Sequence, residues 1–117
     1  MKISIRARGI EWTSELRNHV ERSIEFAVDR YRQRVSGISV YLGDLNGPKG
    51  GVDKLCQITV NLSGRAKPVL ILEQATEILP AVYRATRRLG NRIGGSIRRG
   101  SRPSARRFRD TVRAAAF

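Results

Sequence analysis

The middle of the chain alternates hydrophobic and polar residues in three successive runs, at residues 38–42, 56–62 and 68–73. Alternation with a period of two places the hydrophobic side chains on one face of a β-strand. The segment 44–54, rich in Gly, Asn and Asp, separates the first two runs, and Ser63 and Gly64 suit a tight turn before the third. The sequence therefore predicts a three-stranded meander with one buried face.

One more strand and two helices are expected around this meander. Residues 2–8 alternate in the same way and predict a first strand. Thr13 or Ser14 can cap a helix in which hydrophobic residues recur every three or four positions, and we expect Gly37 to close it.

A second helix is expected after the meander. Thr76 can serve as its cap, and Gly94 and Gly95 favour fraying or termination, since glycine costs about 1 kcal/mol in a helix interior. Its hydrophobic stripe consists of Ile78, Val82, Ala85, Leu89, Ile93 and Ile97. The predicted order is β-α-β-β-β-α, a two-layer α+β sandwich with a four-stranded sheet and both helices on one face, resembling a double-stranded RNA-binding domain.

The length of 117 residues fits one domain with one core. We expect this domain to span residues 1–99 and residues 100–117 to form a basic flexible tail. Cys56, the single cysteine, excludes an internal disulfide, and with the single His19 it cannot form a structural zinc site. We expect a buried, inert thiol, a surface histidine, and neither metal nor cofactor. The N-terminus shows no signal peptide or membrane span, which predicts a cytoplasmic protein.

Positive charge is concentrated in the last third of the chain. Twenty-three Lys and Arg stand against ten Asp and Glu, a net charge of +13. Residues 78–117 contain eleven Arg and one acidic residue, whereas residues 1–77 are close to balanced. Such an excess favours a polyanionic partner. Arginine binds phosphate bidentately and stacks on bases, so the composition favours nucleic acid over a membrane.

On a helical wheel, Arg84, Arg87 and Arg98 lie opposite the hydrophobic stripe of the second helix. Arg88 lies on the flank, and Arg92 borders the stripe. A solvated surface helix usually interleaves acidic and basic residues, but no acidic residue occurs between positions 78 and 109. The arginines of this helix therefore have no evident intramolecular partner. We therefore predict that this face binds RNA.

The segment DLNGPKGGVDKLC, residues 44–56, resembles the D-x-N-G-P-x-G-G-x-D-K-x-C run of short members of the ribosome hibernation promoting factor family, also called ribosome-associated inhibitors or sigma-modulating proteins. The helix entrance is similar to the family's T-x-x-L-R-x-x-V pattern at Thr13, Leu16, Arg17 and Val20. The resemblance covers residues 1 to about 99. Tyr83 departs from the family, which usually has an acidic residue there, and Gly94 and Gly95 interrupt its continuous basic end.

The resemblance implies a protein that binds the small ribosomal subunit and its ribosomal RNA between head and body. There it would block the path of messenger and transfer RNA and keep ribosomes idle under stress. We expect this ribosome-associated protein of the cytoplasm to be a monomer. By position, the residues that would contact RNA are Arg84, Arg87, Arg88, Arg92, Arg98 and Arg99 of the second helix, Arg22, Arg30 and Arg34 of the first, and Lys49 and Lys54 of the loop. Long members carry a further domain that pairs ribosomes, whereas this chain is similar to a short member.

Two other functions remain open at this point: a double-stranded RNA-binding module, which the fold favours, and a constitutive structural ribosomal protein, which the Arg-rich end favours. An enzyme is disfavoured, because GPKGG lacks the spacing of a P-loop and a single histidine with no nucleophile elbow does not support a hydrolytic triad. We expect no small-molecule substrate and no membrane partner.

Overall fold

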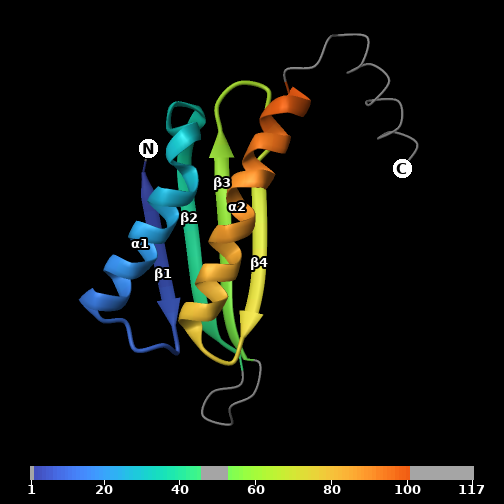
Figure 1. Ribbon diagram of the computed structural model, residues 1–117. Coiled ribbons are helices and arrows are strands. Elements are labelled where there is room, and N and C mark those ends of the chain that lie inside the picture. Colours follow the sequence, from blue (N-terminus) through green and yellow to red (C-terminus); the bar gives the residue numbers. More distant parts are fainter. Residues whose placement is uncertain (1, 46–52, 101–117) are drawn as a thin grey trace.

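The computed structural model describes residues 2–45 and 53–100. The elements follow the order β1 (Ile3–Arg8), α1 (Ser14–Val28), the 3₁₀ helix η1 (Asp29–Arg34), β2 (Val35–Asp44), β3 (Lys54–Leu62), β4 (Val69–Ala75) and α2 (Ile78–Gly100). Both helices lie side by side on the same face of the sheet (Figure 1). The predicted two-layer α+β order is confirmed.

The four strands form one mixed sheet in the order β1-β2-β3-β4. β1 runs parallel to β2, with Ile5 opposite Val40, and the other two pairs are antiparallel. The crossover from β1 to β2 must span the length of the sheet, and α1 makes this crossover. The turn between β3 and β4 uses Gly64 at φ +78°, a conformation that favours glycine.

The core lies between the sheet and the two helices. The inward residues of the central strands include Leu42 and Ile58, both without solvent exposure, and they meet Ile24 of α1 and Leu89 of α2. Burying each of these large side chains contributes about 1.5–3 kcal/mol. The alternation in the strands and the hydrophobic stripe of α2 therefore fold together as the sequence predicts.

The first helix begins as predicted, and the prediction of its end is wrong. The Thr13 hydroxyl accepts a hydrogen bond from the Leu16 amide at 3.1 Å, which satisfies one free N–H of the first turn. However, α1 stops at Val28, and Gly37 lies inside β2 instead of closing the helix. The helical spacing extends to Val35, but this residue pairs with Leu62 in the sheet, so sheet pairing outweighs the local pattern.

The second helix continues through Gly94 and Gly95 to Gly100, so the expected fraying at the glycines is wrong. A Cβ on Gly94 would lie 2.5 Å from the Tyr31 hydroxyl, which shows how closely η1 approaches the helix there. The Ser96 hydroxyl donates a hydrogen bond to the Lys67 carbonyl at 2.7 Å. These contacts hold the C-terminal half of α2 against the domain. Gly100, the first residue of the predicted tail, belongs to α2. Residues 101–117 lie outside the described part, so the predicted tail stays a prediction.

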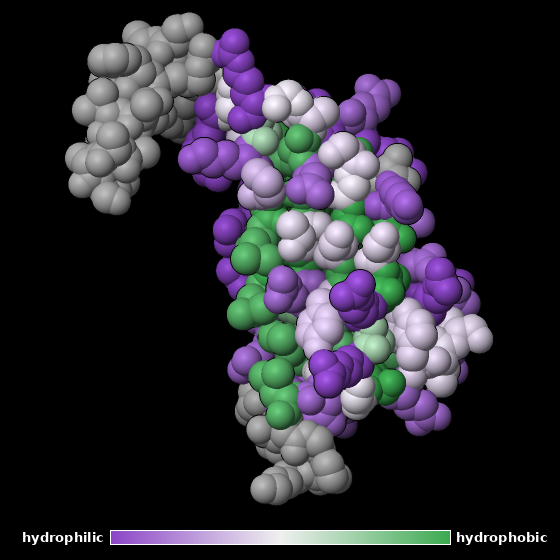
Figure 2. Space-filling model, turned by 180° about the vertical axis from the view of Figure 1, so that it is seen from behind, coloured by the Kyte–Doolittle hydropathy of each residue, from purple (hydrophilic) through white to green (hydrophobic). Residues whose placement is uncertain are grey.

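The second face of the sheet is not covered by either helix (Figure 2). Hydrophilic residues cover much of this face, and hydrophobic residues gather along the side where β4 runs. Leu70 and Leu72 of β4 point outward and are about half exposed. The two faces of the domain therefore differ: one carries the helices, and the other is a bare sheet.

Candidate nucleic-acid interface

All six arginines of α2 lie on its solvent side. Arg84, Arg87, Arg88, Arg92, Arg98 and Arg99 are exposed, while Ala81, Val82, Ala85, Leu89 and Ile93 are buried beneath them. The helix contains no acidic residue. We call these six side chains the arginine face. The helical wheel thus predicted correctly which side of α2 carries the charge.

Two members of the arginine face contact β4, which corrects the expectation that none of them has an intramolecular partner. Arg88 forms an ion pair with the Glu73 carboxylate, and Arg84 donates a hydrogen bond to the Gln74 carbonyl at 3.1 Å. The missing counter-charge comes from the neighbouring strand, because the inner side of β4 brings Glu73 beneath α2. Arg84 and Arg88 therefore help to attach α2 to the sheet.

A groove of about 840 Å³ lies between α1 and α2. Arg22, Phe26 and Arg30 line it from the side of α1 and η1, and Tyr83 and Arg87 line it from α2. The two helices approach each other closely at Gly90, where a Cβ would lie 3.4 Å from the Ala27 carbonyl oxygen. The structure thus brings together three of the predicted arginines, from segments about sixty residues apart, with two exposed aromatic rings.

Arg34 and the two lysines do not join this groove. Arg34 is half-buried in η1, and its carbonyl accepts a hydrogen bond from the Ser63 amide at 2.8 Å, next to the β3–β4 turn. Lys49 lies outside the described residues. Lys54 lies at the start of β3, where its Nζ is 3.2 Å from Asp53 and 3.3 Å from Asp44. Its charge is therefore already compensated within the protein.

The environment of Lys54 is reflected in its pKa. Desolvation is the largest single contribution and lowers the pKa, but the hydrogen bonds and charges of Asp53 and Asp44 together raise it above its ordinary value. Asp53 itself has no solvent exposure, so Lys54 compensates a buried carboxylate where the loop rejoins the sheet. This observation favours a structural role for Lys54.

Cys56 and His19 lie where the sequence predicts them. Cys56 is fully buried in β3, and burial, reinforced by the charge of Glu73, raises the pKa of its thiol to about 12. A thiol with such a pKa stays protonated and unreactive at neutral pH. His19 is exposed on α1. In residues 2–45 and 53–100, no group of three or more His, Cys, Asp or Glu side chains is placed to hold a metal ion.

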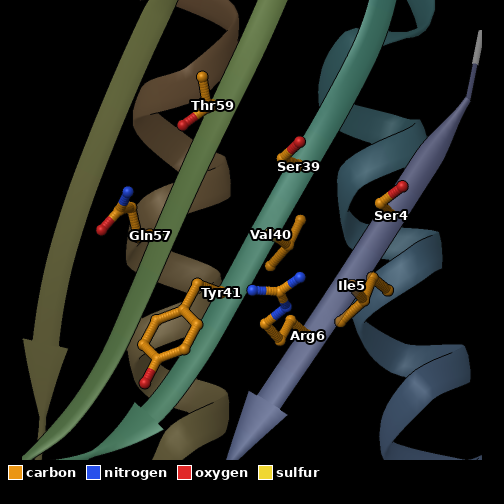
Figure 3. A pocket seen from close by; sticks show the side chains of 8 residues that line it. All are labelled: Ser4, Ile5, Arg6, Ser39, Val40, Tyr41, Gln57 and Thr59. Carbon is orange, nitrogen blue, oxygen red and sulfur yellow. The ribbon is translucent and has the colours of Figure 1, made fainter.

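The open face of the sheet offers a second, shallower hollow of about 420 Å³ (Figure 3). Arg6, Tyr41 and Gln57 form one row across β1, β2 and β3, and Ser4, Ser39 and Thr59 form another. Tyr41 is the one aromatic residue among the side chains labelled there. A sheet that binds RNA through base stacking uses several aromatic residues, so this face differs from an RNA-recognition-motif surface.

The sequence did not single out Phe26 as part of the site. This residue is 88% exposed, and it lies outside the hydrophobic stripe of α1. A large aromatic side chain on the polar side of an amphipathic helix is the signal that would have found it.

Among the helices that the structure describes, none combines the length and the hydrophobicity that a membrane span requires.

Two solved structures show how this fold occurs in known proteins. The N-terminal domain of Protein Y from Thermus thermophilus is 29% identical, with a TM-score of 0.61 over 79% of this chain and 91% of that one. A ribosomal subunit interface protein from Coxiella burnetii has a TM-score of 0.64 over 81% of this chain and 96% of that one, at 16% identity. No protein-family model and no curated protein matches the chain.

The architecture is thus that of a small α+β protein with an arginine-bearing pair of helices on one side of a mixed sheet. Both similar structures are members of the hibernation-promoting factor family, so the resemblance inferred from the loop and the helix entrance is confirmed. The likeness to the Coxiella protein concerns the fold alone, and the likeness to Protein Y also extends to sequence.

Proposed function

We propose that this chain is a non-enzymatic, ribosome-associated factor that inhibits translation. In this proposal it binds small-subunit ribosomal RNA in the channel for messenger and transfer RNA, and it keeps ribosomes idle under stress. It acts in the cytoplasm as a monomer, with the small subunit as its partner. The arginine face of α2 supplies the main contacts with phosphate, and Arg22 of α1 and Arg30 and Arg34 of η1 supply others.

The observation that carries the proposal is the exposed arginine face, which has no acidic residue on its own helix. Like charges at this spacing repel one another, and they are compensated when phosphates bind between them. The similarity to Protein Y and to a ribosomal subunit interface protein supports the ribosome as the source of those phosphates. Arg84 and Arg88 can donate hydrogen bonds to RNA phosphates while they also contact β4, because a guanidinium has five N–H donors.

Binding to any RNA duplex is the second candidate function. It is favoured by the β2-β3-β4-α2 order, since three antiparallel strands followed by a helix also characterise double-stranded RNA-binding domains. Such a module recognises the A-form shape and does not require a ribosome.

A bacterial cell-free translation system separates these functions. Purified protein is added with increasing amounts of a free RNA duplex as competitor. We expect inhibition at roughly stoichiometric amounts of protein to ribosomes, and we expect duplex at the same nucleotide concentration as ribosomal RNA to relieve it little. Full relief by duplex would favour the general duplex binder. Absence of inhibition would contradict the proposed function.

A further inference from the structure

The groove between α1 and α2 exposes two aromatic rings that the packing of the domain does not require. Phe26 is 88% exposed and Tyr83 is 41% exposed, although α1 and α2 bury their hydrophobic stripes in the core. An isolated exposed phenylalanine is unremarkable, but here both rings line one groove. They are placed to contact a flat, apolar partner.

The charges around these rings restrict the chemistry of that partner. Arg22, Arg30 and Arg87 line the same groove, and none of its lining residues is acidic. Among the described residues, no ion pair involves any of these three arginines, and Arg30 lies 5.8 Å from the ring centre of its neighbour Tyr31. The partner therefore combines negative charge with flat rings, as a nucleotide does with its phosphate and its base.

We propose that unpaired nucleotides of RNA bind in this groove, with their bases stacked on Phe26 and Tyr83 and their phosphates held by Arg22, Arg30 and Arg87. This inference rests on the proposed RNA-binding function and adds a preference to it. Bases in an A-form duplex are already stacked on one another, whereas bases of a loop or a single strand can stack on protein side chains. The groove therefore favours single-stranded RNA without reading its sequence, because every base has a flat face.

The test uses the full chain and two probes of about ten nucleotides: a single-stranded RNA, and a ribose-phosphate oligomer of the same length without bases. The double variant Phe26→Ala, Tyr83→Ala removes both rings. Leu70→Ala, Leu72→Ala is the matched control, since it truncates two half-exposed hydrophobic side chains on the opposite face of the sheet. Phe26→Trp retains a stacking surface.

We expect the aromatic double variant to lose about 5- to 150-fold in affinity for the RNA for each base that loses its stacking partner. Its affinity for the oligomer without bases should stay unchanged, and so should the salt dependence of binding, because the phosphate contacts remain. Phe26→Trp should bind the RNA as well as the original chain does. The leucine control should bind both probes normally.

Other outcomes overturn the inference in distinguishable ways. Equal binding of both probes, unchanged in the double variant, would reject base stacking and leave the proposed function intact. Equal loss for both probes would mean that the rings act only through the fold of the groove. Tighter binding of an acidic, phenylalanine-containing peptide, lost in the double variant, would assign the groove to a protein partner. If neither probe nor the ribosome binds, the proposed function itself fails.

Discussion

Replacing Glu73 by Gln tests whether the ion pair with Arg88 competes with RNA. The Glu73 carboxylate lies on the inner side of β4, and its side chain is 19% exposed, while that of Arg88 is 47% exposed. A phosphate that engages Arg88 fully must share this guanidinium with the carboxylate. The variant removes the competitor and leaves a neutral side chain of almost the same shape.

The expected effect follows from the exposure of the pair. Ion pairs that solvent reaches contribute about 0.2–1 kcal/mol, because water and salt screen the charges. Removing the competition should therefore raise RNA affinity about 1.4- to 5-fold at low salt, and the gain should shrink as salt increases. The free energy of unfolding should fall by a similar 0.2–1 kcal/mol, because α2 loses one attachment to β4.

Fluorescence anisotropy with labelled RNA at low and high salt measures the first effect, and urea denaturation measures the second. Glu77→Gln is the matched control, since it removes an exposed negative charge near the start of α2 that forms no ion pair with the described residues. In an Arg88→Gln background, Glu73→Gln should gain no more than this control does. Unchanged or weaker RNA binding by Glu73→Gln, or the same gain without Arg88, would refute the competition between Glu73 and phosphate.

Two predictions concern the stability of the domain. Cys56 keeps its proton up to about pH 12, whereas an exposed thiol ionises near pH 9. The contribution of Cys56 to the free energy of unfolding should therefore be constant below pH 9 and then fall by about 1.4 kcal/mol per pH unit, as the unfolded chain releases its proton. The raised pKa of Lys54 lowers the free energy of unfolding in the same direction above pH 10.5. Urea denaturation across this pH range should show a smaller decline of this free energy in Cys56→Ala. An equal decline in the variant and the original chain would contradict the raised pKa of Cys56. Leu89→Ala, at a fully buried position, should cost about 2–5 kcal/mol, and Leu70→Ala, on the open face, should stay within about 0.5 kcal/mol. Thermal unfolding of the two variants checks this, and similar losses in both would mean that the core is misassigned.

The strands and both helix faces could be predicted because each has a regular hydrophobic period. Hydrophobic residues recur every second position around Ile58 and every three or four positions around Leu89, and the buried positions in the structure follow the same intervals. The end of α1 could not be predicted in this way. Val35 fits the helical spacing, but its pairing with Leu62 depends on a strand twenty-seven residues further along the chain.

The candidate site shows the same limit. The sequence predicted that Arg84, Arg87 and Arg88 share the exposed side of α2, since this depends only on the helical period. It could not predict which of them are paired, because the partner of Arg88 comes from β4. Nor could it place Phe26 and Tyr83 in one groove, since the contact between α1 and α2 depends on the tertiary fold. The contacts of Lys49 lie outside the described residues.

Sedimentation of the purified protein with purified ribosomal subunits tests the central claim most directly. At low salt, we expect it to sediment with small subunits and intact ribosomes and not with large subunits alone. Arg87→Gln, Arg92→Gln should shift it toward the top of the gradient, and each lost phosphate contact should reduce the dependence of log K on log salt by about 0.7–0.9. Arg6→Gln, Arg8→Gln changes the charge equally on the first strand, where both side chains are exposed away from the helices, and should sediment like the original chain. A protein that stays at the top of the gradient at low salt would contradict the account, and equal losses in both double variants would contradict the placement of the RNA-binding surface on α2.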